Sequence, residues 1–312
     1  MKVGCYIGGI YPRSDMLIEA TRRSPPNLPE IFRRDKKRVI DLQIRAGLTY
    51  VSDPLLDWSD MLRPYLALKG VEQGALNRVF EQNTFYRMPV VVDRVEWVEP
   101  ITLKNLSLDL LPKGREWKVD LPDPYTFAQL SDNRYYRDRR DLILDLAKAL
   151  AKEAETLQQH FKLIQINAPS ICSVRSRDEL ELAYEALRTV TRGLSAKTYL
   201  HLYFGDPTPI LSDLLDFPVS GLGLDLVNTK IPDGLRFGKM GLAAGCVDAG
   251  NTKMEKPEKV AEEVKRVVDA VEPSELYICP NYDLEYVPRA YANRKVLRLS
   301  KIAKLLEEEM RG

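Results

Sequence analysis

Residues 198–206 read Thr198-Tyr199-Leu200-His201-Leu202-Tyr203-Phe204-Gly205-Asp206, a pattern that predicts a buried strand running into a Gly-Asp turn. Side chains alternate between the two faces of a strand, so Tyr199, His201 and Tyr203 share one face and the two leucines share the other. The segment therefore combines an apolar face with a polar and aromatic face that reaches the end of the strand.

Two nearby segments repeat this arrangement. Residues 163–169 place Gln165 and Asn167 on one face of a predicted strand and isoleucines on the other. Residues 221–226 place leucines on one face, with two glycines and Asp225 on the other. Three neighbouring strands of this kind predict a barrel whose functional mouth lies where the strands end.

Strands and helices alternate along the whole chain. Strands are predicted at 3–8, 48–52, 90–92, 117–121, 163–168, 197–204, 222–227, 239–247 and 275–280. Helices are predicted at 29–46, 58–66, 141–157, 177–191, 209–215, 257–271 and 290–310. About eight β/α units in 312 residues favour an α/β fold, a (β/α)8 TIM barrel that forms a single domain over residues 1–312. An irregular insertion is expected around 70–115, with an ordered loop at 83–89.

The composition excludes several classes of function. Lys and Arg number 46 against 45 Asp and Glu, and this balance argues against a protein that binds nucleic acid or a membrane surface. The sequence has neither an apolar run of about 18 residues nor a signal peptide, so we expect a cytoplasmic protein that does not cross a membrane. Charged residues make up 29% of the chain, which leans towards a heat-adapted protein.

The four cysteines, Cys5, Cys172, Cys246 and Cys279, show no CxxC spacing. Scattered cysteines in a cytoplasmic chain are expected to be small hydrophobic residues of the core. A metal site that includes Cys246 or Cys279 from another direction stays open. No Gly-x-Gly-x-x-Gly or Gly-Lys-Ser/Thr motif supports a nucleotide-binding fold.

Several polar residues at the predicted strand ends have both a functional and a structural interpretation. His201 is either a metal ligand or acid/base group or a hydrogen-bonded core histidine. Asp225 either pairs with His201 or is a structural carboxylate bonded to turn amides. Arg13 follows a Gly-Gly turn and either binds a carboxylate or forms a surface ion pair. Asp53 closes the strand at 48–52.

Two aromatic and polar segments suit a flat heterocyclic ligand. Residues 83–87 run from Asn83 to Arg87, so that Arg87 clamps an anionic ligand and Phe85 or Tyr86 stacks on it. The alternative is a loop that packs over the barrel. Residues 57–60 also combine an aromatic residue, Trp58, with polar neighbours.

Six segments, in this order, resemble motifs of one family. They are Gly9-Ile10-Tyr11-Pro12-Arg13-Ser14, Asp123-Pro124-Tyr125-Thr126, Ile164-Gln165-Ile166-Asn167-Ala168-Pro169, Leu200-His201-Leu202-Tyr203, Leu222-Gly223-Leu224-Asp225 and Cys279-Pro280-Asn281-Tyr282-Asp283-Leu284. They are similar to motifs in the catalytic half of cobalamin-independent methionine synthase, whose superfamily also holds uroporphyrinogen decarboxylase. The resemblance covers nearly the whole chain. It implies the barrel fold and methyl transfer from a methylated pterin, folate or corrinoid donor to homocysteine or a related thiol.

The resemblance also implies a zinc site of His, Cys, Glu and Cys that activates the homocysteine thiolate. Here His201 matches the histidine, Tyr203 and Tyr282 stand at the two cysteine positions, and Asp225 stands at the glutamate position. Tyrosine is a poor zinc ligand, so no metal ligand and no cofactor are assigned. The family's acidic residue near the methyl donor falls on Asn167, which cannot supply a proton.

Two interpretations of function follow. In the first, the chain is a methyltransferase with an altered site that acts on a different thiol or donor, or that a partner chain completes. In the second, it is a non-catalytic paralogue that binds a methyl donor or pairs with a zinc-bearing methionine synthase. A third interpretation is a decarboxylase of the uroporphyrinogen type, for which Arg13 and Asp53 are candidate contacts at the mouth.

His201 and Asp225 are the predicted polar groups of the site. The predicted substrate- or donor-binding residues are Arg13, Asp53, Trp58, Asn83, Arg87, Gln165, Asn167, Tyr203 and Tyr282. Of these, Gln165 and Asn167 are expected to contact the ligand, and the two tyrosines are expected to close the former metal position. The expected partners are a small molecule, either a methyl donor or an amino-acid thiol, and a zinc-bearing methionine synthase chain.

Overall fold

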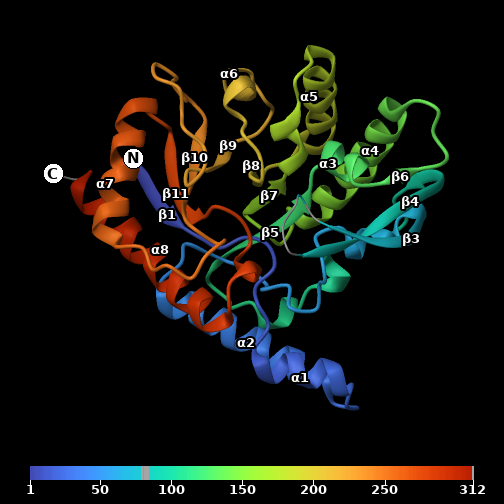
Figure 1. Cartoon of the computed structure of the whole chain (residues 1–312), viewed down its shortest axis with the longest axis horizontal. Coiled ribbons are helices and arrows are strands. Elements are labelled where there is room, and N and C mark those ends of the chain that lie inside the picture. Colours follow the sequence, from blue (N-terminus) through green and yellow to red (C-terminus); the bar gives the residue numbers. More distant parts are fainter. Residues whose placement is uncertain (79, 81–83, 311–312) are drawn as a thin grey trace. The chain divides into compact units, whose positions relative to one another are not determined.

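The computed structural model describes residues 1–78, 80 and 84–310 of the chain. Within this part, eight strands form one sheet in the order β1-β11-β10-β9-β8-β7-β5-β2 (Figure 1). Their bounds are β1 Lys2–Cys5, β2 Tyr50–Val51, β5 Glu116–Pro122, β7 Leu163–Asn167, β8 Lys197–Leu202, β9 Gly221–Asp225, β10 Gly241–Val247 and β11 Glu275–Pro280. Thr49 N, next to β2, donates a hydrogen bond to Cys5 O of β1 at 2.8 Å. The two ends of the order therefore meet, and the sheet is nearly closed.

Helices alternate with these strands, and this confirms the predicted (β/α)8 TIM barrel. They are α1 Asp15–Arg23, α2 Leu28–Ala46, α3 Pro124–Gln129, α4 Arg139–Leu157, α5 Arg177–Thr191, α6 Leu211–Leu214, α7 Pro257–Val271 and α8 Arg289–Glu309. The bounds of α5, α7 and β11 agree with the predicted residues. In the part of the chain that the structure describes, no helix has the length and apolar character required to cross a membrane.

The chain forms two compact units. Unit 1 consists of Met1–Asp57, Leu106–Lys118 and Gly223–Gly312. Unit 2 consists of Trp58–Asn105 and Val119–Leu222. The prediction that residues 1–312 form a single domain remains a prediction.

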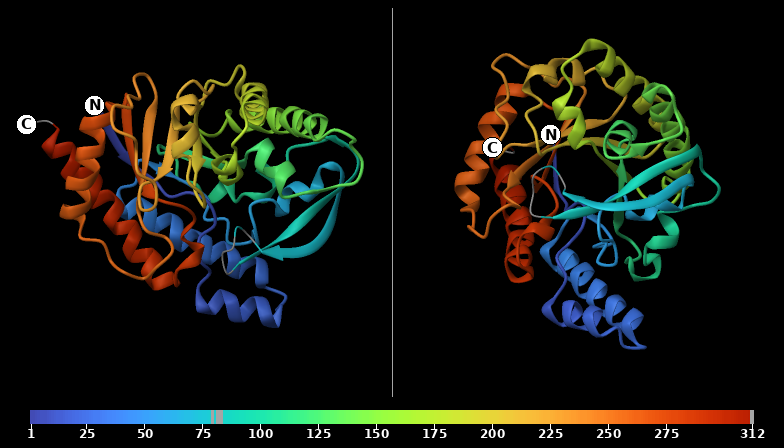
Figure 2. Two further views of the ribbon diagram at one scale, coloured as in Figure 1. Left: turned by 45° about the horizontal axis from the view of Figure 1, so that its top comes forward. Right: turned by 45° about the vertical axis from the view of Figure 1, so that its right-hand side comes forward.

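In unit 1, parallel strands pack against amphipathic helices. β11 pairs with β1 on one side and with β10 on the other. The helical period brings one stripe of α7 to the interior, where Val260, Val264, Val268 and Val271 are buried. α8, drawn in red, runs alongside β1 and β11 (Figure 2). The core of this unit is therefore made by one apolar stripe of α7 together with buried strand residues.

In unit 2, α4 packs against α5 and is capped by a local side chain. Asp138 precedes the helix, and its Oδ1 accepts a hydrogen bond from Arg140 N at 2.8 Å. An N-cap aspartate satisfies a backbone donor that the first turn leaves free. Leu142, Leu146 and Leu150 lie on the buried stripe of the helix. The predicted amphipathic helix is thus confirmed and begins two residues earlier than expected.

Residues 69–78 and 85–96 form two antiparallel strands where a loop and a short strand are predicted. They are β3 Lys69–Arg78 and β4 Phe85–Glu96, and β6 Asp132–Asn133 pairs with the other side of β4. Pro89 favours a loop at the sequence level, because proline cannot donate to a ladder. It lies opposite Gln73, next to a shift of register between Gln73 and Leu76. A strand tolerates proline at such an irregularity.

The helix predicted at 58–66 is wrong. Arg63–Ala67 forms a short 3-10 helix instead, with Pro64 in its first turn. The preceding turn is held by Asp60, whose Oδ1 accepts a hydrogen bond from Leu62 N at 3.0 Å. An aspartate that bonds its own backbone two residues on stabilises a turn and competes with a helix.

Glu153 on α4 fastens the segment that follows β4. Its carboxylate accepts hydrogen bonds from Trp97 Nε1 at 2.7 Å, from Thr102 N at 2.6 Å and from Ile101 N at 3.1 Å. The residue is only 1% exposed. A buried carboxylate is tolerated because these donors satisfy it. Its removal would leave the same donors without an acceptor.

We expect Glu153→Ala to lower the free energy of unfolding by about 3 kcal/mol or more, because several buried donors lose their acceptor together. Urea denaturation followed by circular dichroism measures this change. Glu155→Ala, on the exposed side of the same helix, is the matched control and should change stability by less than about 0.5 kcal/mol. Equal losses in the two variants would contradict the role of the buried carboxylate.

Candidate functional site

The polar side chains predicted at the ends of β7 and β8 lie together in unit 2. The two strands pair in parallel, with Asn167 opposite His201 and Gln165 opposite Tyr199. Gln165, Asn167 and His201 are each at most 5% exposed. Ala168 N donates to His201 O at 2.9 Å and extends the pairing beyond β7. The alternation of the sequence therefore places three predicted site residues correctly on neighbouring strands.

Gln165 and Asn167 form a carboxamide pair. Gln165 Nε2 donates a hydrogen bond to Asn167 Oδ1 at 2.7 Å. Gln165 Oε1 is buried and accepts no hydrogen bond from the residues that the structure describes. A buried acceptor without a donor costs about 1–3 kcal/mol. A ligand with an N–H or O–H group would supply the donor that this oxygen lacks.

Tyr203 follows β8, at a position that the resemblance assigns to a cysteine ligand. It is 4% exposed, and its ring packs edge-on against Phe204 with 4.9 Å between the ring centroids. Its carbonyl oxygen accepts a weak hydrogen bond from Cys172 Sγ at 3.6 Å. A packed aromatic ring therefore occupies the place where a zinc site would need a thiolate.

Asp123 directly follows β5, lies in unit 2 and is absent from the predicted site residues. Its carboxylate accepts hydrogen bonds from Tyr125 N at 3.2 Å and Thr126 N at 2.6 Å at the start of α3. Asp123 N donates to Asn167 O at 3.0 Å. Burial raises the pKa of Asp123 to about 6, although these hydrogen bonds act in the opposite direction. An Asp directly before a proline is the signal of a helix start that identifies this residue.

In unit 1, Asp225 ends β9 and organises the turn that follows. Its Oδ1 accepts hydrogen bonds from Val227 N at 3.0 Å, Asn228 N at 3.1 Å and Asn281 Nδ2 at 3.1 Å. Its Oδ2 accepts from Asn228 Nδ2 at 2.8 Å. Asn281 Oδ1 in turn accepts from Ala249 N at 2.8 Å, which ties the ends of β10 and β11 to the same group. These contacts are those expected of the structural carboxylate that the sequence left open as an alternative.

Asp53, just after β2 in unit 1, is the centre of a buried ion-pair network. Lys36 Nζ lies 3.1 Å from Asp53 Oδ1 and 2.9 Å from Asp57 Oδ1, and Lys36 is 1% exposed. Asp53 also accepts hydrogen bonds from Leu55 N and Ser107 N, each at 2.8 Å. Burial raises the pKa of Asp53, and the charge of Lys36 opposes this shift. The role of Asp53 in ligand binding remains a prediction.

The loop after β1 is held in unit 1 by the loop after β11. Gly9 has a φ of 64°, and a Cβ at this position would overlap the carboxylate of Asp283. Ile10 N donates to Asp283 Oδ2 at 3.0 Å. Arg13 Nε donates to Leu56 O at 2.6 Å, and burial lowers the pKa of Arg13. The glycine is therefore required for a close approach of two loops that both lie at strand ends.

Tyr282 follows β11, at the second position that the resemblance assigns to a cysteine. Its ring packs edge-on against Tyr286, with 5.3 Å between the ring centroids. Burial raises the pKa of Tyr282 to about 12, with smaller contributions from the charges of Asp248 and Asp225. The neutral phenol is therefore the stable form of Tyr282 at neutral pH.

Two further predicted contacts have structural partners in unit 2. Trp58 Nε1 donates to Asn105 O at 3.3 Å. Arg87 lies in β4, where its backbone N donates to Asp60 Oδ2 at 3.1 Å and its side chain donates to Gly74 O at 3.4 Å. Their roles in ligand binding remain predictions. Asn83, the other predicted contact of this segment, lies outside the described residues.

The cysteines do not offer a zinc site. Cys5, Cys172 and Cys279 are buried, as predicted, and Cys246 is half-buried. Burial raises the pKa of Cys5 to about 11 and that of Cys246 to about 12, whereas zinc binds the thiolate. No group of three His, Cys, Asp or Glu side chains in residues 1–78, 80 and 84–310 could hold a metal ion. The residues present therefore do not fit the zinc that the resemblance implies.

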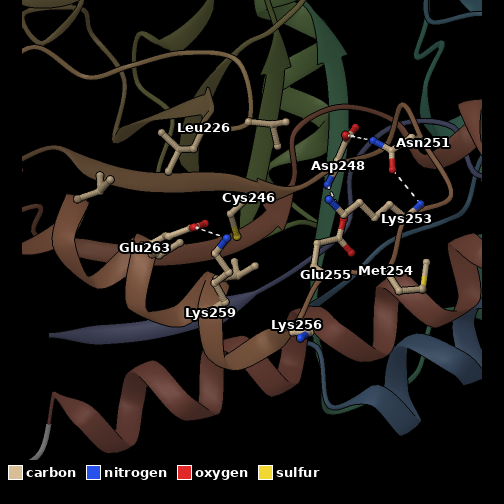
Figure 3. A pocket seen from close by; sticks show the side chains of 14 residues that line it. Leu226, Cys246, Asp248, Asn251, Lys253, Met254, Glu255, Lys256, Lys259 and Glu263 are labelled. Atoms are coloured by element: carbon tan, nitrogen blue, oxygen red, sulfur yellow. Dashed lines mark hydrogen bonds and ion pairs between the residues drawn. The ribbon is translucent and has the colours of Figure 1, made fainter.

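His201 and Asp225 fall in different units, so their predicted pairing remains a prediction. A pocket of about 580 Å³ lies beside β10 and α7 in unit 1 (Figure 3). Leu226, Cys246 and Val264 give it an apolar lining. None of the predicted donor-binding residues lines this pocket, whereas Leu226 and Val227 of the turn after Asp225 do.

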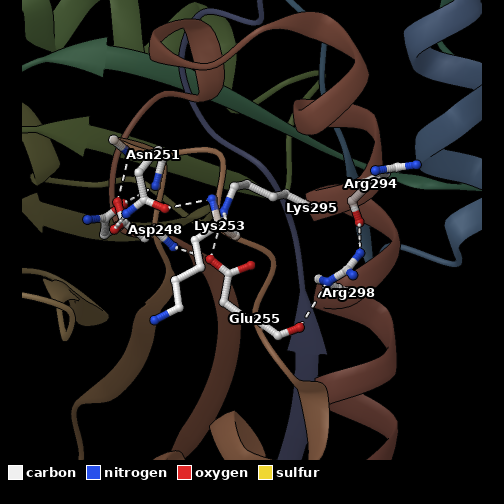
Figure 4. Close-up of polar contacts among 10 residues, drawn as sticks. Asp248, Asn251, Lys253, Glu255, Arg294, Lys295 and Arg298 are labelled. Carbon is white, nitrogen blue, oxygen red and sulfur yellow. Dashed lines mark hydrogen bonds and ion pairs between the residues drawn. The ribbon is translucent and has the colours of Figure 1, made fainter.

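The loop after β10 is anchored to α8 by a buried ion pair (Figure 4). Lys295 is fully buried, and its Nζ donates to Glu255 Oε1 at 2.7 Å and to Lys253 O at 2.9 Å. Asp248 N donates to the same carboxylate oxygen at 3.1 Å, and Arg298 Nε donates to Glu255 O at 3.0 Å. The polar groups next to the pocket therefore hold the loop in place.

We expect the stability of the protein to fall as the pH rises from about 4 to about 7, in proportion to the ionisation of Asp123. The folded-state pKa of about 6 lies above the usual value of about 3.9, so the native state binds this proton more tightly. The contribution of protonated Asp123 to the free energy of unfolding is therefore nearly complete at about pH 4, and it is lost as the pH rises through 6. Asp123→Asn keeps the capping acceptor but cannot titrate.

Relative to Asp123→Asn, the wild-type free energy of unfolding should drop by roughly 2 kcal/mol between pH 4 and pH 7. Urea denaturation at several pH values measures the difference. Asp138→Asn, at the exposed N-cap of α4, is the control and should show no comparable change. Parallel pH profiles of the wild type and Asp123→Asn would show that the buried carboxyl is not linked to stability.

Comparison with known proteins identifies the family. A family model described as cobalamin-independent synthase, N-terminal domain, matches residues 68–272. Methionine synthase of Thermococcus kodakarensis is 31% identical over 323 residues, which cover 97% of this chain and 93% of the relative. Methionine synthase of Sulfurisphaera tokodaii is 29% identical over 315 residues, which cover 97% of this chain and 92% of the relative.

Solved structures show the same fold. The B12-independent methionine synthase from Shewanella sp. W3-18-1, in complex with selenomethionine, superposes with a TM-score of 0.80 at 19% identity, covering 92% of this chain and 91% of that chain. The putative vitamin-B12-independent methionine synthase from Listeria monocytogenes gives a TM-score of 0.77 at 13% identity, covering 98% and 99%. The chain described here belongs to the cobalamin-independent methionine synthase family.

Proposed function

We propose that this chain takes part in methyl transfer to homocysteine as a donor-binding component, and that a separate zinc-bearing methionine synthase chain activates the thiol. The observation that carries this proposal is the chemistry of the strand-end groups. The side chains beside His201 are the carboxamides Gln165 and Asn167, and those beside Asp225 are the carboxamides Asn228 and Asn281. Carboxamides bind polar ligands, but they do not replace thiolates around zinc.

The open acceptor on Gln165 supports binding of the donor rather than of the thiol. Gln165 Oε1 needs an N–H or O–H partner, and Asn167 Oδ1 is already occupied by Gln165 Nε2. A reduced pterin presents several N–H groups along one edge of its ring, which suits two adjacent carboxamides. The ammonium group of homocysteine is also an N–H donor, but its charge would have to be buried beside two neutral groups. The carboxamide pair is therefore better matched to a neutral nitrogen heterocycle.

The family comparison supports the reaction. The matching model describes the N-terminal domain of the synthase. The relatives that match most of this chain are named methionine synthase, which supports homocysteine methylation as the reaction. A decarboxylase of the uroporphyrinogen type has less support, because Arg13 and Asp53 are both engaged within unit 1.

The purified chain alone should hold much less than one zinc per chain and should form no methionine from homocysteine and a methyl donor. Adding a zinc-bearing methionine synthase from the same source should raise turnover at least about tenfold above that of the added chain alone. Metal content is measured by inductively coupled plasma mass spectrometry, and methionine by chromatography. Turnover by this chain alone, with one zinc per chain, would instead support a complete methyltransferase with an altered site.

Gln165→Leu tests donor binding separately. The variant removes the open acceptor at similar volume, so we expect the affinity for the methyl donor to fall about tenfold, as for a lost buried hydrogen bond. Isothermal titration calorimetry measures the dissociation constant. Gln159→Leu, at an exposed position after α4, is the matched control and should leave the affinity unchanged. An unchanged affinity in Gln165→Leu would remove Gln165 from the binding site.

A further inference from the structure

The connection from β9 to β10 in unit 1 contains no helix. Residues 226–240, all of which the structure describes, form turns and irregular loop instead. In a (β/α)8 barrel each strand is normally followed by a helix, and these helices form the outer layer. The loop covers the C-terminal end of α7, where Phe237 is buried and its backbone N donates to Val271 O at 2.7 Å. The other end of α7 is left for the pocket.

The pocket of about 580 Å³ has an apolar lining drawn from three elements (Figure 3). These are the turn after β9, strand β10 and helix α7, which contribute Leu226, Val227, Cys246, Val260, Val264 and Val267. Val227 is 42% exposed at its edge. Contiguous exposed apolar surface with a polar rim marks a place where another molecule binds. The pocket is therefore a candidate interaction surface.

The pocket follows α7 for about three helical turns. The residues that this segment contributes are three or four positions apart, from Lys256, which directly precedes the helix, to Val267. At a rise of 1.5 Å per residue, this stretch is roughly 16 Å long. A second helix lying beside α7 at a spacing of about 8–10 Å fits such a length. A compact small molecule would occupy only part of it.

The rim of the pocket carries positive charge that this chain leaves unpaired. Lys253 and Lys256 are exposed, and their side chains form no salt bridge within residues 1–78, 80 and 84–310. A third lysine, Lys259, lies 3.7 Å from Glu263 of the same helix. Two cations at the rim are therefore available to a partner.

The carboxylates of the loop after β10 are already engaged. Asp248 Oδ1 accepts a hydrogen bond from Gly250 N at 2.7 Å. Glu255 Oε1 accepts from the buried Lys295 Nζ at 2.7 Å, so its charge is neutralised from α8 (Figure 4). The free charge next to the apolar lining is therefore positive, and its complement is an acidic group on an otherwise apolar surface.

We propose that this pocket is the docking surface for an amphipathic helix of the zinc-bearing methionine synthase chain. Apolar side chains of that helix fill the space against Leu226 and Val264, and carboxylates on its flank meet Lys253 and Lys256. The docked helix completes the outer layer where none follows β9. This proposal rests on the proposed function, which requires the two chains to meet.

Biolayer interferometry with the zinc-bearing methionine synthase of the same source measures the affinity of the complex. The double variant Lys253→Glu, Lys256→Glu reverses both free charges, and we expect the dissociation constant to rise at least about tenfold. The double variant Lys113→Glu, Lys162→Glu is the matched control, because both lysines are exposed and lie outside the pocket. It should leave the affinity unchanged.

Val227→Asp tests the apolar part of the surface. It places a carboxylate at the edge of the apolar lining, where docking would have to bury it, so the dissociation constant should again rise about tenfold or more. Val98→Asp is the control at a valine that is 66% exposed in unit 2. Circular dichroism of every variant verifies that the native fold is kept.

Unchanged affinity in both pocket variants would overturn the docking surface. Sedimentation velocity of this chain alone tests a second copy as the occupant, and a dimer that the pocket variants dissociate would overturn the assignment to the synthase. Absence of any complex would overturn the docking surface as well. It would overturn the proposed function only if the added synthase also fails to raise methionine formation.

Discussion

The need to satisfy buried polar groups at the strand ends determines how this barrel is built. Asp225 accepts four hydrogen bonds, three from the turn after β9 and one from Asn281, which follows β11. Asp123 caps α3, and Asp53 is held by Lys36 and two backbone donors. Water does not reach these carboxylates, so each unmade bond would cost free energy. The aspartates therefore fix the loops, and few polar atoms remain to bind a ligand. Gln165 Oε1 is one that does.

Much of the fold follows from local patterns. The spacing of apolar residues in α7 fits only a helix, and the short apolar run of β11 fits a buried strand. Both elements occur at the predicted residues. The hairpin of β3 and β4 was not predictable in this way. Its second strand contains Pro89, which argues against a strand in the sequence, and a shift of register accommodates this residue. The short 3-10 helix at 63–67 likewise depends on a hydrogen bond from Leu62 to the side chain of Asp60, which competes with helix formation.

The candidate site likewise has features that the sequence predicts and features that it does not. Strand alternation is sufficient to place Gln165, Asn167 and His201 on one face, because the period of two is a property of any strand. The sequence could not show that Asp225 is saturated by turn donors, because that depends on Asn281 from β11. Nor could it show that Phe80 meets Phe204, because that contact requires the hairpin. The resemblance named the positions of the former zinc ligands, and only the structure shows how their replacements pack.

The replacements change what the strand ends can do. A buried carboxamide is neutral over the whole working pH range, so it can hold the edge of a polar ring without the cost of a buried charge. It cannot lower the pKa of a thiol, which needs a metal ion, a positive charge or a nearby base to become a thiolate at neutral pH. Tyr282, whose pKa is raised by burial, cannot do this either. Activation of homocysteine therefore requires groups other than Tyr203 and Tyr282, whereas binding of the methyl donor does not. The division of the reaction between two chains that we propose rests on this difference in chemistry.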